Sequence, residues 1–265
     1  MDIIPVLDLA AGVAVWARAG DRAQYEPVES ELVPSAVGDA TALLAAFRNR
    51  LGASTCYIAD LDAIQGGAVQ RTMLRELAEL ETGFAGAIMV DGGAHTPGST
   101  LEVLACGASQ VVVGLETLKA FSDLARIVES VGEPQVVFSV DLRQGSPILH
   151  RTMQDATGVQ PDALSLAAQA VDTGVGTLLL LDLARVGTGC GVDLGLIEDL
   201  RRRFPELRLL AGGGVLSRRD LNRMRDAGCD GALVATAVHT GRISAADLAD
   251  LAAEPVGAQS PSVSR

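Results

Sequence analysis

The chain has 265 residues, of which 48% are hydrophobic and 3% aromatic, and its formal net charge is −12. This length suits a single α/β barrel, and a composition rich in aliphatic side chains is typical of a barrel core filled by Val, Ile and Leu. The negative charge argues against a nucleic-acid or membrane surface, because phosphates would be repelled. It is compatible with a small phosphorylated molecule held in a local site.

The sequence carries no signal for export, membrane insertion or a cofactor. Asp2 and Asp8 interrupt the N-terminal apolar run, which lacks a basic segment, and no uncharged apolar run reaches ~18 residues. There is no Walker loop, no G-x-G-x-x-G turn after the first strand, no CxxC pair and no histidine cluster. The cysteines are widely spaced: Cys56, Cys106, Cys190 and Cys229. We therefore expect a cytoplasmic protein with reduced structural thiols, no metal and no cofactor.

Strands and helices alternate along the first half of the chain. Short apolar runs predict strands at residues 3–7, 56–59, 87–90 and 110–113, with a further short strand at 13–17 that forms a hairpin with the first. Apolar residues at helical spacing predict helices at 40–50, 70–81, 100–105 and 121–131. The polar stretch 20–34 is a long loop, and loops of this length are more often functional than idle.

The second half repeats this alternation. Strands are predicted at 136–140, 177–181, 207–210 and 232–234, and helices at 165–172, 194–204, 218–226 and 247–252, with a loop at 145–158. The run Arg201-Arg202-Arg203 at one helix end indicates a solvated face that meets the C-terminal helix dipole. Residues 253–265 are rich in Ser, Pro, Gly and Ala and predict a disordered tail after a single domain at 1–252.

Eight strands separated by helices must pair in parallel, which favours a closed (β/α)8 TIM barrel over an open doubly wound sheet. The two halves also correspond in sequence. The turn Asp91-Gly92-Gly93 matches Gly212-Gly213-Gly214, and the same offset places Gly107 on Gly228. We therefore predict an α/β protein whose barrel is built from two duplicated half barrels.

Two of these strands end on an aspartate at corresponding positions. Asp8 follows the first strand, and Asp141 follows the strand that opens the second half. In a barrel both carboxylates would face the same mouth, where one can act as a general base and the other as a general acid. The alternative is that both carboxylates accept hydrogen bonds from loop N–H groups and only cap the loops.

Glycine-rich turns at the strand ends predict two phosphate sites, because such turns leave backbone N–H groups free to face an anion. The first site would comprise Gly92, Gly93, His95 and Gly114, and the second Gly213, Gly214, Ala235 and Thr236. Two such sites with two carboxylates between them suit an elongated bisphosphate. Alternatively, the glycines only permit tight turns and His95 only bonds to its own loop.

Other residues near the predicted mouth are less specific. Asp60, Asp62 and Asp182 end strands, where they either orient loops or touch substrate. Trp16 either stacks on a heterocycle or anchors its loop, and Arg143 is close enough in sequence to lower the pKa of Asp141. His150 and His239 are weaker candidates, the latter at the start of the terminal segment.

The chain resembles the HisA/HisF family of histidine biosynthesis. The segments that carry the resemblance are IIPVLDLAAGVAV, CYIADLDAIQGG, VDGGAHT, VVFSVDLRQG, LLDLARVGTGCG, AGGGVLS and LVATAVHTG. The resemblance implies a duplicated barrel without a cofactor that rearranges an aminoaldose to an aminoketose on a phosphoribosyl aminoimidazole substrate. It also implies that Asp8 is the base, that Asp141 is the acid, and that Gly187 and Thr188 contact the substrate. In the synthase branch the same pair serves a cyclisation with ammonia from a glutaminase partner.

The sequence departs from the family pattern at the first phosphate site. Asp91 stands where the family has a glycine, His95 where it has an arginine, and Gly114-Leu115-Glu116 where it has Gly-Ser or Gly-Thr. Asp91 and Glu116 would bring negative charge towards a phosphate and weaken its binding. Two departures lie elsewhere: Trp16 stands where the isomerase usually has an arginine, with Arg18 two residues on, and Val186 stands where the family has an aspartate.

Three hypotheses remain open from the sequence. The protein is the histidine-pathway isomerase, or a paralogue that acts on a different phosphorylated metabolite by similar proton transfers, or a non-catalytic barrel that binds a ligand. In each case the partner is a phosphorylated small molecule rather than a nucleic acid or a membrane. The chain is expected to be a monomer or a small homo-oligomer.

Overall fold

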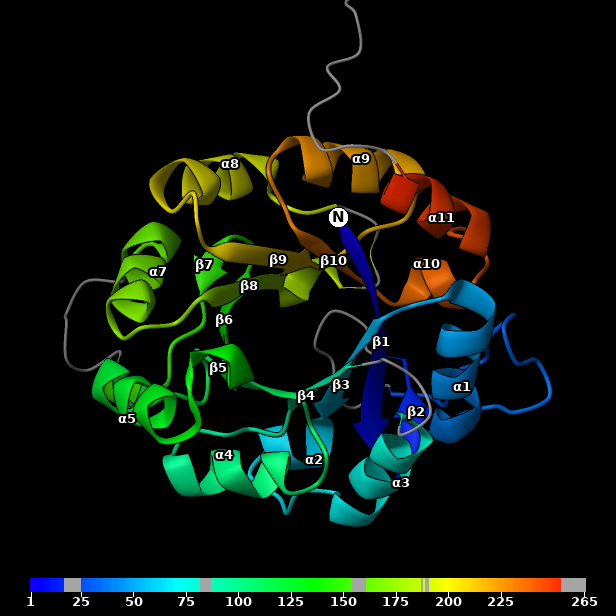
Figure 1. The fold of residues 1–265 in the computed structure, drawn as a ribbon, viewed down its shortest axis with the longest axis horizontal. Coiled ribbons are helices and arrows are strands. Elements are labelled where there is room, and N and C mark those ends of the chain that lie inside the picture. Colours follow the sequence, from blue (N-terminus) through cyan, green and yellow to red (C-terminus); the bar gives the residue numbers. More distant parts are fainter. Residues whose placement is uncertain (17–24, 82–86, 154–160, 187, 189–190, 254–265) are drawn as a thin grey trace, which may run out of the picture.

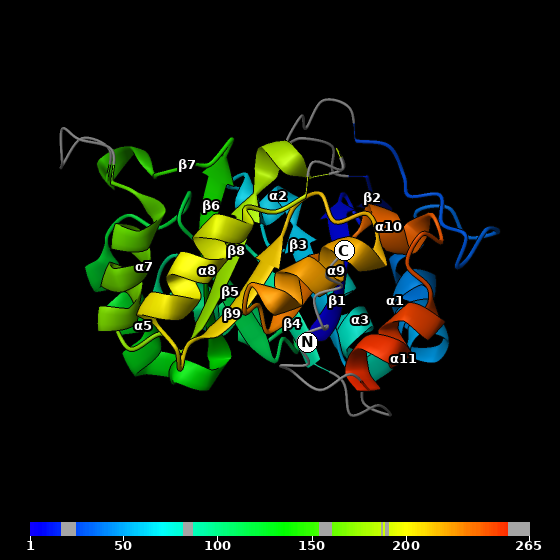
Figure 2. The same ribbon diagram turned by 90° about the horizontal axis from the view of Figure 1, so that it is seen from above.

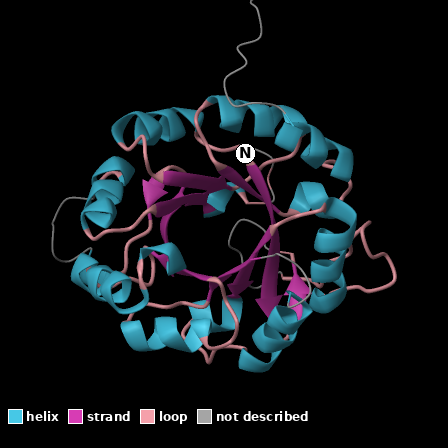
Figure 3. Cartoon of the chain, viewed as in Figure 1, coloured by secondary structure: helices cyan, strands magenta, loops and turns pink. Residues whose placement is uncertain are grey.

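A computed structural model places the chain in a closed barrel of parallel strands surrounded by helices (Figures 1 and 3). The structure describes the whole chain except residues 17–24, 82–86, 154–160, 187, 189–190 and 254–265. The barrel strands are β1 (Asp2–Ala10), β3 (Thr55–Asp60), β4 (Ala87–Asp91), β5 (Gln110–Gly114), β6 (Val136–Arg143), β8 (Thr177–Asp182), β9 (Arg208–Gly212) and β10 (Gly231–Val234). β10 pairs in parallel with β1, with Asp2 opposite Gly231, and this pairing closes the sheet. The predicted TIM barrel is confirmed.

The helices cover the outside of the barrel. They are α1 (Ala40–Leu51), α3 (Arg71–Glu81), α4 (Pro97–Leu104), α5 (Phe121–Val131), α7 (Ala163–Asp172), α8 (Leu194–Arg203), α9 (Arg218–Asp226) and α11 (Ala245–Ala253). Local signals define their ends: the side chain of Asp39 caps the first turn of α1, and Gly52 ends that helix with a φ of 67°. In the described part of the chain, no helix is long and apolar enough to cross a membrane.

Several short elements were not predicted. These are the helices α2 (Leu61–Ile64) and α10 (Thr236–His239), the 3-10 turns η2 (Glu133–Gln135) and η3 (Leu183–Arg185), and the strand β7 (Ser146–Pro147). The loop predicted at 145–158 is therefore wrong at its start, because β7 pairs with the end of β6. The predicted disordered tail lies outside the described residues, apart from Ala253 in α11.

Each half barrel carries a hairpin on its first strand. β2 (Val13–Val15) pairs antiparallel with β1, and β7 pairs antiparallel with β6. Both hairpins turn through two residues with positive φ, Ala11 and Gly12 in one and Gln144 and Gly145 in the other. Figure 2 shows β2 and β7 on the same side of the barrel, at the carboxyl ends of the strands. The repeated hairpin supports the duplication predicted from the glycine turns.

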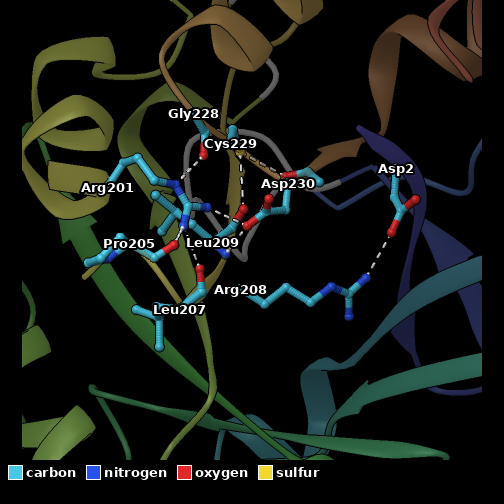
Figure 4. Close-up of polar contacts among 10 residues, drawn as sticks. Asp2, Arg201, Pro205, Leu207, Arg208, Leu209, Gly228, Cys229 and Asp230 are labelled. Atoms are coloured by element: carbon cyan, nitrogen blue, oxygen red, sulfur yellow. Dashed lines mark hydrogen bonds and ion pairs between the residues drawn. The ribbon is translucent and has the colours of Figure 1, made fainter. Parts of the chain in front are cut away.

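Arg201 is a structural residue at the opposite side of the barrel (Figure 4). Its guanidinium donates hydrogen bonds to the backbone oxygens of Gly228, Pro205 and Leu207 and pairs with the carboxylate of Asp230. This contradicts the predicted solvated face for Arg201, whose side chain is only 24% exposed, while the prediction holds for Arg202 and Arg203. Helix periodicity turns Arg201 towards the loop before β10, whereas Arg202, 73% exposed, stays on the surface.

The core has two layers, as the alternation of side chains along a strand requires. Outward residues of the strands pack against the helices in a large aliphatic cluster. Inward residues fill the barrel interior, among them Ile4, Met89, Val137, Leu179 and Leu233. Because the interior is filled by these side chains, only the inward positions near the carboxyl ends of the strands remain available for a site.

Candidate active site

The carboxylates at the barrel mouth occupy inward-facing strand positions, in line with the side chains that fill the barrel interior. Successive inward positions are two residues apart, so Ile4 leads to Asp8 on β1, Met89 to Asp91 on β4, and Val137 to Asp141 on β6. The rows of β1 and β4 are apolar up to their aspartate, whereas the row of β6 has Ser139 directly before Asp141. All three aspartates therefore point to the mouth because of strand register.

These aspartates line one cavity of 340 Å³. Its other polar or charged lining residues are Tyr25, Tyr57, Glu116, Arg143 and Thr236, and its apolar or glycine lining includes Leu61, Leu181, Val186, Gly213, Gly214, Leu233 and Ala235. The size and mixed character of the lining suit a small polar metabolite. The cavity lies where barrel enzymes carry their active sites, at the carboxyl ends of the strands.

Asp8 is half-buried, and no described residue donates a hydrogen bond to its carboxylate. Burial raises the pKa of Asp8 to about 7, because desolvation disfavours the charged form. A second, much smaller cavity lies beside it, lined by Val6, Trp16, Thr236 and His239 among others. Asp8 is therefore a carboxylate that titrates near neutral pH and faces a ligand cavity.

Asp141 is buried and more strongly bonded. The hydroxyl of Ser139 donates to its Oδ1 at 2.6 Å, and the backbone N–H of Glu116 donates to its Oδ2 at 3.4 Å. A Cβ at Gly114 would lie 3.0 Å from that Oδ2, so glycine at 114 makes room for the carboxylate. Burial, with the negative charges of Glu116 and Asp91, raises the pKa of Asp141 to about 8. The sequence left open whether Arg143 lowers this pKa; the pKa is raised, because desolvation dominates.

Asp91 occupies the mouth between Tyr57 and Glu116. The phenol of Tyr57 donates to its Oδ2 at 3.4 Å, and the backbone N–H of Gly93 donates to its Oδ1 at 3.1 Å. Burial is the largest cause that raises the pKa of Asp91 to about 7, and the charge of Glu116 adds to it. Tyr57 was not singled out from the sequence, although it shares the inward row of β3 with Ala59.

The glycine turn of the second half lies in the cavity wall. Gly213 and Gly214 have φ of 104° and 82°, and both line the cavity together with Ala235 and Thr236. In the part of the chain that the structure describes, no acceptor binds the backbone N–H of Gly214 or of Thr236. These N–H groups and the Thr236 hydroxyl can therefore bind an anionic group of a ligand.

The glycine turn of the first half is used differently. Gly92, Gly93 and Gly114 are not part of the cavity lining. A Cβ at Gly93 would lie 2.8 Å from the backbone oxygen of Ala63, and one at Gly92 would lie 2.8 Å from Val103. His95 is held by its own loop, with Nδ1 3.0 Å from the oxygen of Gly93. These residues pack the turn against α2 and α4.

The remaining strand-end carboxylates orient the hairpins and loops. Asp60 accepts from the backbone N–H groups of Ala63 and Gln70 at 3.1 and 2.7 Å. Asp62 accepts from Ala11, and Asp182 accepts from Gln144 and Gly145 at 3.1 Å each. Neither Asp60 nor Asp182 is part of the cavity lining. Of the two alternatives for these residues, the structure favours loop orientation.

Trp16 packs edge-on against His239, with ring centroids 5.3 Å apart, and so anchors its loop near Asp8. His239 is buried, and desolvation lowers its pKa to about 4, so it is neutral at physiological pH. Thr188 is exposed and bonds the oxygen of Arg185. The predicted contacts Arg18 and Gly187 lie outside the described residues, as does Cys190.

Comparison with known proteins identifies a matching family and several relatives of similar length. A sequence model of the family described as "Histidine biosynthesis protein" matches residues 2–244. A Thermus thermophilus protein named 1-(5-phosphoribosyl)-5-((5-phosphoribosylamino)methylideneamino) imidazole-4-carboxamide isomerase is 33% identical over 243 residues, covering 92% of this chain and 96% of its own length. A Streptococcus sanguinis protein of the same name is 27% identical over 245 residues, covering 92% of this chain and 95% of its own.

A further relative has no assigned activity: an uncharacterized protein of Methanocaldococcus jannaschii is 28% identical over 243 residues, covering 91% of this chain and 94% of its own. The family match extends over nearly all of the barrel, from the first residue of β1 to the residue before α11. The resemblance inferred from the sequence is thereby confirmed, and the chain belongs to the histidine biosynthesis protein family.

Proposed function

We propose that this protein is an aldose–ketose isomerase that carries out an Amadori-type rearrangement of a phosphorylated aminoaldose. The observation that carries the proposal is a pair of carboxyl groups, Asp8 and Asp141, that face one cavity with pKa values of about 7 and about 8. A general base and a general acid are most effective when their pKa values lie near the operating pH. Relatives named as imidazole-4-carboxamide isomerases support the same reaction class.

The different surroundings of the two groups support a different role for each. Asp141 has the higher pKa and stays protonated near neutral pH, so it can give a proton to the ring oxygen as the bond from that oxygen to C1 breaks. Asp8, with the lower pKa and no donor to its carboxylate among the described residues, removes the proton from C2 to give an enolamine. The enolamine then takes a proton at C1 and loses the C2 hydroxyl proton, which yields the aminoketose.

The substrate phosphate would bind at the turn formed by Gly213, Gly214 and Thr236. The available N–H groups and the hydroxyl there face the cavity and can replace the water around a phosphate. This contact fixes one end of the substrate, so that its C1 and C2 lie between the two carboxyl groups. We further propose that residues 1–252 suffice for activity, in the cytoplasm, as a monomer or small homo-oligomer.

The test is a direct assay of aminoaldose-to-aminoketose conversion with the ribotide on which the named relatives act, followed by absorbance or by chromatographic separation of the two isomers. We expect the protein to convert the ribotide, and we expect Asp8→Asn and Asp141→Asn each to abolish this turnover. Turnover that persists in either variant would exclude the proton-transfer role. A folded protein that binds phosphorylated sugars but converts none of them would support the non-catalytic alternative.

A second candidate is a paralogue with a different phosphorylated substrate. The observation that favours it is the presence of Asp91 and Glu116 in the cavity lining, on the side away from the Gly213 turn in strand order. The acid–base chemistry would be the same, and only the group bound at β4 and β5 would differ.

A further inference from the structure

The two half barrels pair with each other at two seams, β5 with β6 and β10 with β1, and these seams differ in one hydrogen bond. At the first seam, the backbone N–H of Leu115 donates to the oxygen of Ser139 at 2.9 Å. The offset between the halves places Leu115 on Thr236, and Val6, like Ser139, lies two residues before the strand-end aspartate. At the second seam, however, no bond joins the Thr236 N–H to the Val6 oxygen, although the structure describes both residues.

The backbone after β10 explains the difference. β10 ends at Val234, whereas β5 continues to Gly114, the position equivalent to Ala235. Ala235 has a φ of −106° and a ψ of −84°, so the chain turns away from β1 one residue earlier than it does at the first seam. The Thr236 N–H, which has no acceptor among the described residues, therefore stays available at the main cavity, which Thr236 lines.

The side chain of His239 supplies the donor that the Val6 oxygen would otherwise lack. Its ring donates to that oxygen, and its Nδ1 lies 3.1 Å from the hydroxyl oxygen of Ser30. Burial lowers the pKa of His239 to about 4, so the ring is neutral and has a single N–H. Because a backbone oxygen can only accept, this N–H is directed to Val6, and the Ser30 hydroxyl donates to Nδ1. The two bonds fix the orientation of the ring.

Neighbours from the first half barrel hold this ring in place. Its centroid lies 5.3 Å from that of Trp16 and 5.6 Å from that of Phe47. The backbone oxygen of His239 accepts from the N–H of Glu31 at 2.8 Å, and both His239 and Ser30 are buried. The partners come from α1 and from the segment between β2 and α1, so two elements orient one side chain of the second half.

The first half has no polar side chain at the equivalent position. The offset places Leu118 on His239, and Leu118 is a fully buried apolar residue. Packing at this position therefore needs only an apolar side chain. The Val6 oxygen bonds a buried ring and so lies away from bulk water, where an oxygen without a donor is costly. Either the Thr236 N–H or the His239 ring must supply that donor, and here the ring does.

We propose that His239 is a positioning residue that bonds the Val6 oxygen in place of the backbone and thereby leaves the Thr236 N–H for the phosphate of the substrate. The inference rests on the proposed function for the position of the phosphate, at the Gly213 turn. His239 itself does not touch the phosphate in this arrangement, because it lines the small second cavity and is not part of the lining of the main one.

The first test measures the dissociation constant of ribose 5-phosphate by titration calorimetry. His239→Phe keeps an aromatic ring but removes the donor, so the Val6 oxygen should recruit the Thr236 N–H, as its equivalent is recruited at the first seam. We expect the affinity for ribose 5-phosphate to fall about tenfold, because one hydrogen bond to a charged phosphate is lost. His239→Gln, whose amide retains an N–H donor, should remain within about threefold of the unmodified protein.

The matched control is His150→Phe. It makes the same substitution at a histidine that bonds the Thr152 hydroxyl, with Nδ1 2.9 Å from that oxygen, and that is part of neither cavity lining. The dissociation constant of ribose 5-phosphate should not change in this variant.

A second readout reports directly on the N–H group and needs no ligand. Amide hydrogen exchange of Thr236, followed by NMR in a phosphate-free buffer, should slow about tenfold in His239→Phe, because the N–H gains a backbone acceptor. A merely structural role of His239 predicts the opposite, since a loosened seam exchanges faster. Ser30→Ala removes only the hydroxyl that orients the ring, so it should show the same two changes to a smaller extent, and it provides the test if His239→Phe does not fold.

Unchanged affinity for ribose 5-phosphate or faster exchange of Thr236 in the folded variants would overturn the inference. Steady-state kinetics adds a third readout. We expect KM to rise about tenfold in His239→Phe while kcat changes less than about threefold, because the two carboxyl groups are retained. A lower kcat with an unchanged KM would also overturn the inference, since His239 would then act on the carboxyl groups.

These results separate the inference from the proposed function. Turnover of the ribotide with an unchanged KM in His239→Phe would retain the isomerase and exclude the role of His239. Weaker binding of ribose 5-phosphate and slower exchange of Thr236 in that variant, without conversion of any aminoaldose by the unmodified protein, would retain the role of His239 and exclude the isomerase.

Discussion

The two half barrels use the same local design for different purposes. Both begin with a strand and hairpin that deliver a carboxyl group, Asp8 in one and Asp141 in the other, and both carry a glycine turn after their third barrel strand. In the second half the turn at Gly213 lines the cavity, whereas in the first half the turn at Gly93 packs against α2. A duplicated backbone thus retains its geometry, while only one of the two turns lines the cavity.

The carboxyl groups also differ between the halves. Asp141 is buried and bonded to Ser139, while Asp8 is half-buried and has no donor among the described residues. In the proposed reaction Asp8 would supply the base and Asp141 the acid. Equivalent positions would then have acquired opposite proton-transfer roles through their neighbours.

The largest effect is expected when either proton carrier is removed. Asp8→Asn and Asp141→Asn keep the shape and the hydrogen-bond capacity of the side chain but cannot exchange the proton, so kcat should fall about 10³-fold in each. The double variant should be little worse than either single one, because the two groups serve one reaction. Steady-state kinetics measures this, with Asp226→Asn as a surface control. A loss below tenfold in one variant would mean that its half barrel supplies no proton carrier.

The barrel itself was predictable from the sequence, and much of the mouth was not. Apolar runs identified every barrel strand because both faces of a parallel strand are buried. The helices α2 and α10 span four residues each and leave no periodic signal of their own. The sequence left the role of Asp60 open, because its partners, Ala63 in the short helix α2 and Gln70 in the loop that follows it, take positions that depend on the folded barrel. Tyr57 was missed because an aromatic residue in a strand is ordinarily a core residue.

A matched pair of glycine substitutions tests whether the two turns differ in function. Gly213 and Gly93 both have positive φ, and a Cβ at either would lie 2.8 Å from a backbone oxygen, that of Asp182 or of Ala63. Both Gly213→Ala and Gly93→Ala should therefore lose about 1–3 kcal/mol of stability. Only Gly213→Ala should also raise KM for the phosphorylated substrate, by about tenfold, because only that turn faces the cavity.

Chemical denaturation and steady-state kinetics on the same preparations separate the two effects. Equal losses of stability in the two variants, with a raised KM in Gly213→Ala alone, would show that the two turns differ in function. Equal increases in KM would show that the first turn also binds the substrate, and the distinction between the halves would be lost.

The buried carboxyl group of Asp91 should make the protein less stable as the pH rises. Asp91 has a folded-state pKa of about 7, above ~3.9 in an unfolded chain, so between these values the folded protein holds the extra proton. Its contribution to stability is full below about pH 4 and is lost as the pH rises through about 7. Asp91→Asn should leave the free energy of unfolding unchanged at pH 4 and raise it at pH 8, on the order of 2 kcal/mol.

Urea denaturation at a series of pH values measures this prediction, with Asp226→Asn as the exposed control. The corresponding residue of the second half is Gly212. The loss of stability that Asp91 causes at high pH therefore has no equivalent at this position in the second half. A variant that is destabilised equally at both pH values would show that the hydrogen bonds of Asp91 outweigh the burial of its charge.

The smallest effect concerns the hydrogen bond that the Ser139 hydroxyl donates to Asp141. Among the described residues, Asp8 has no such donor. The hydrogen bond from Ser139 opposes the rise in the pKa of Asp141, because it stabilises the carboxylate. Ser139→Ala should therefore move the alkaline limb of kcat/KM, expected near pH 8, upward by less than about one unit, and leave the acid limb, expected near pH 7, in place. A pH–rate profile of the variant measures both limbs. A shift of the acid limb instead would reverse the roles of the two halves, since it would make Asp141 the base.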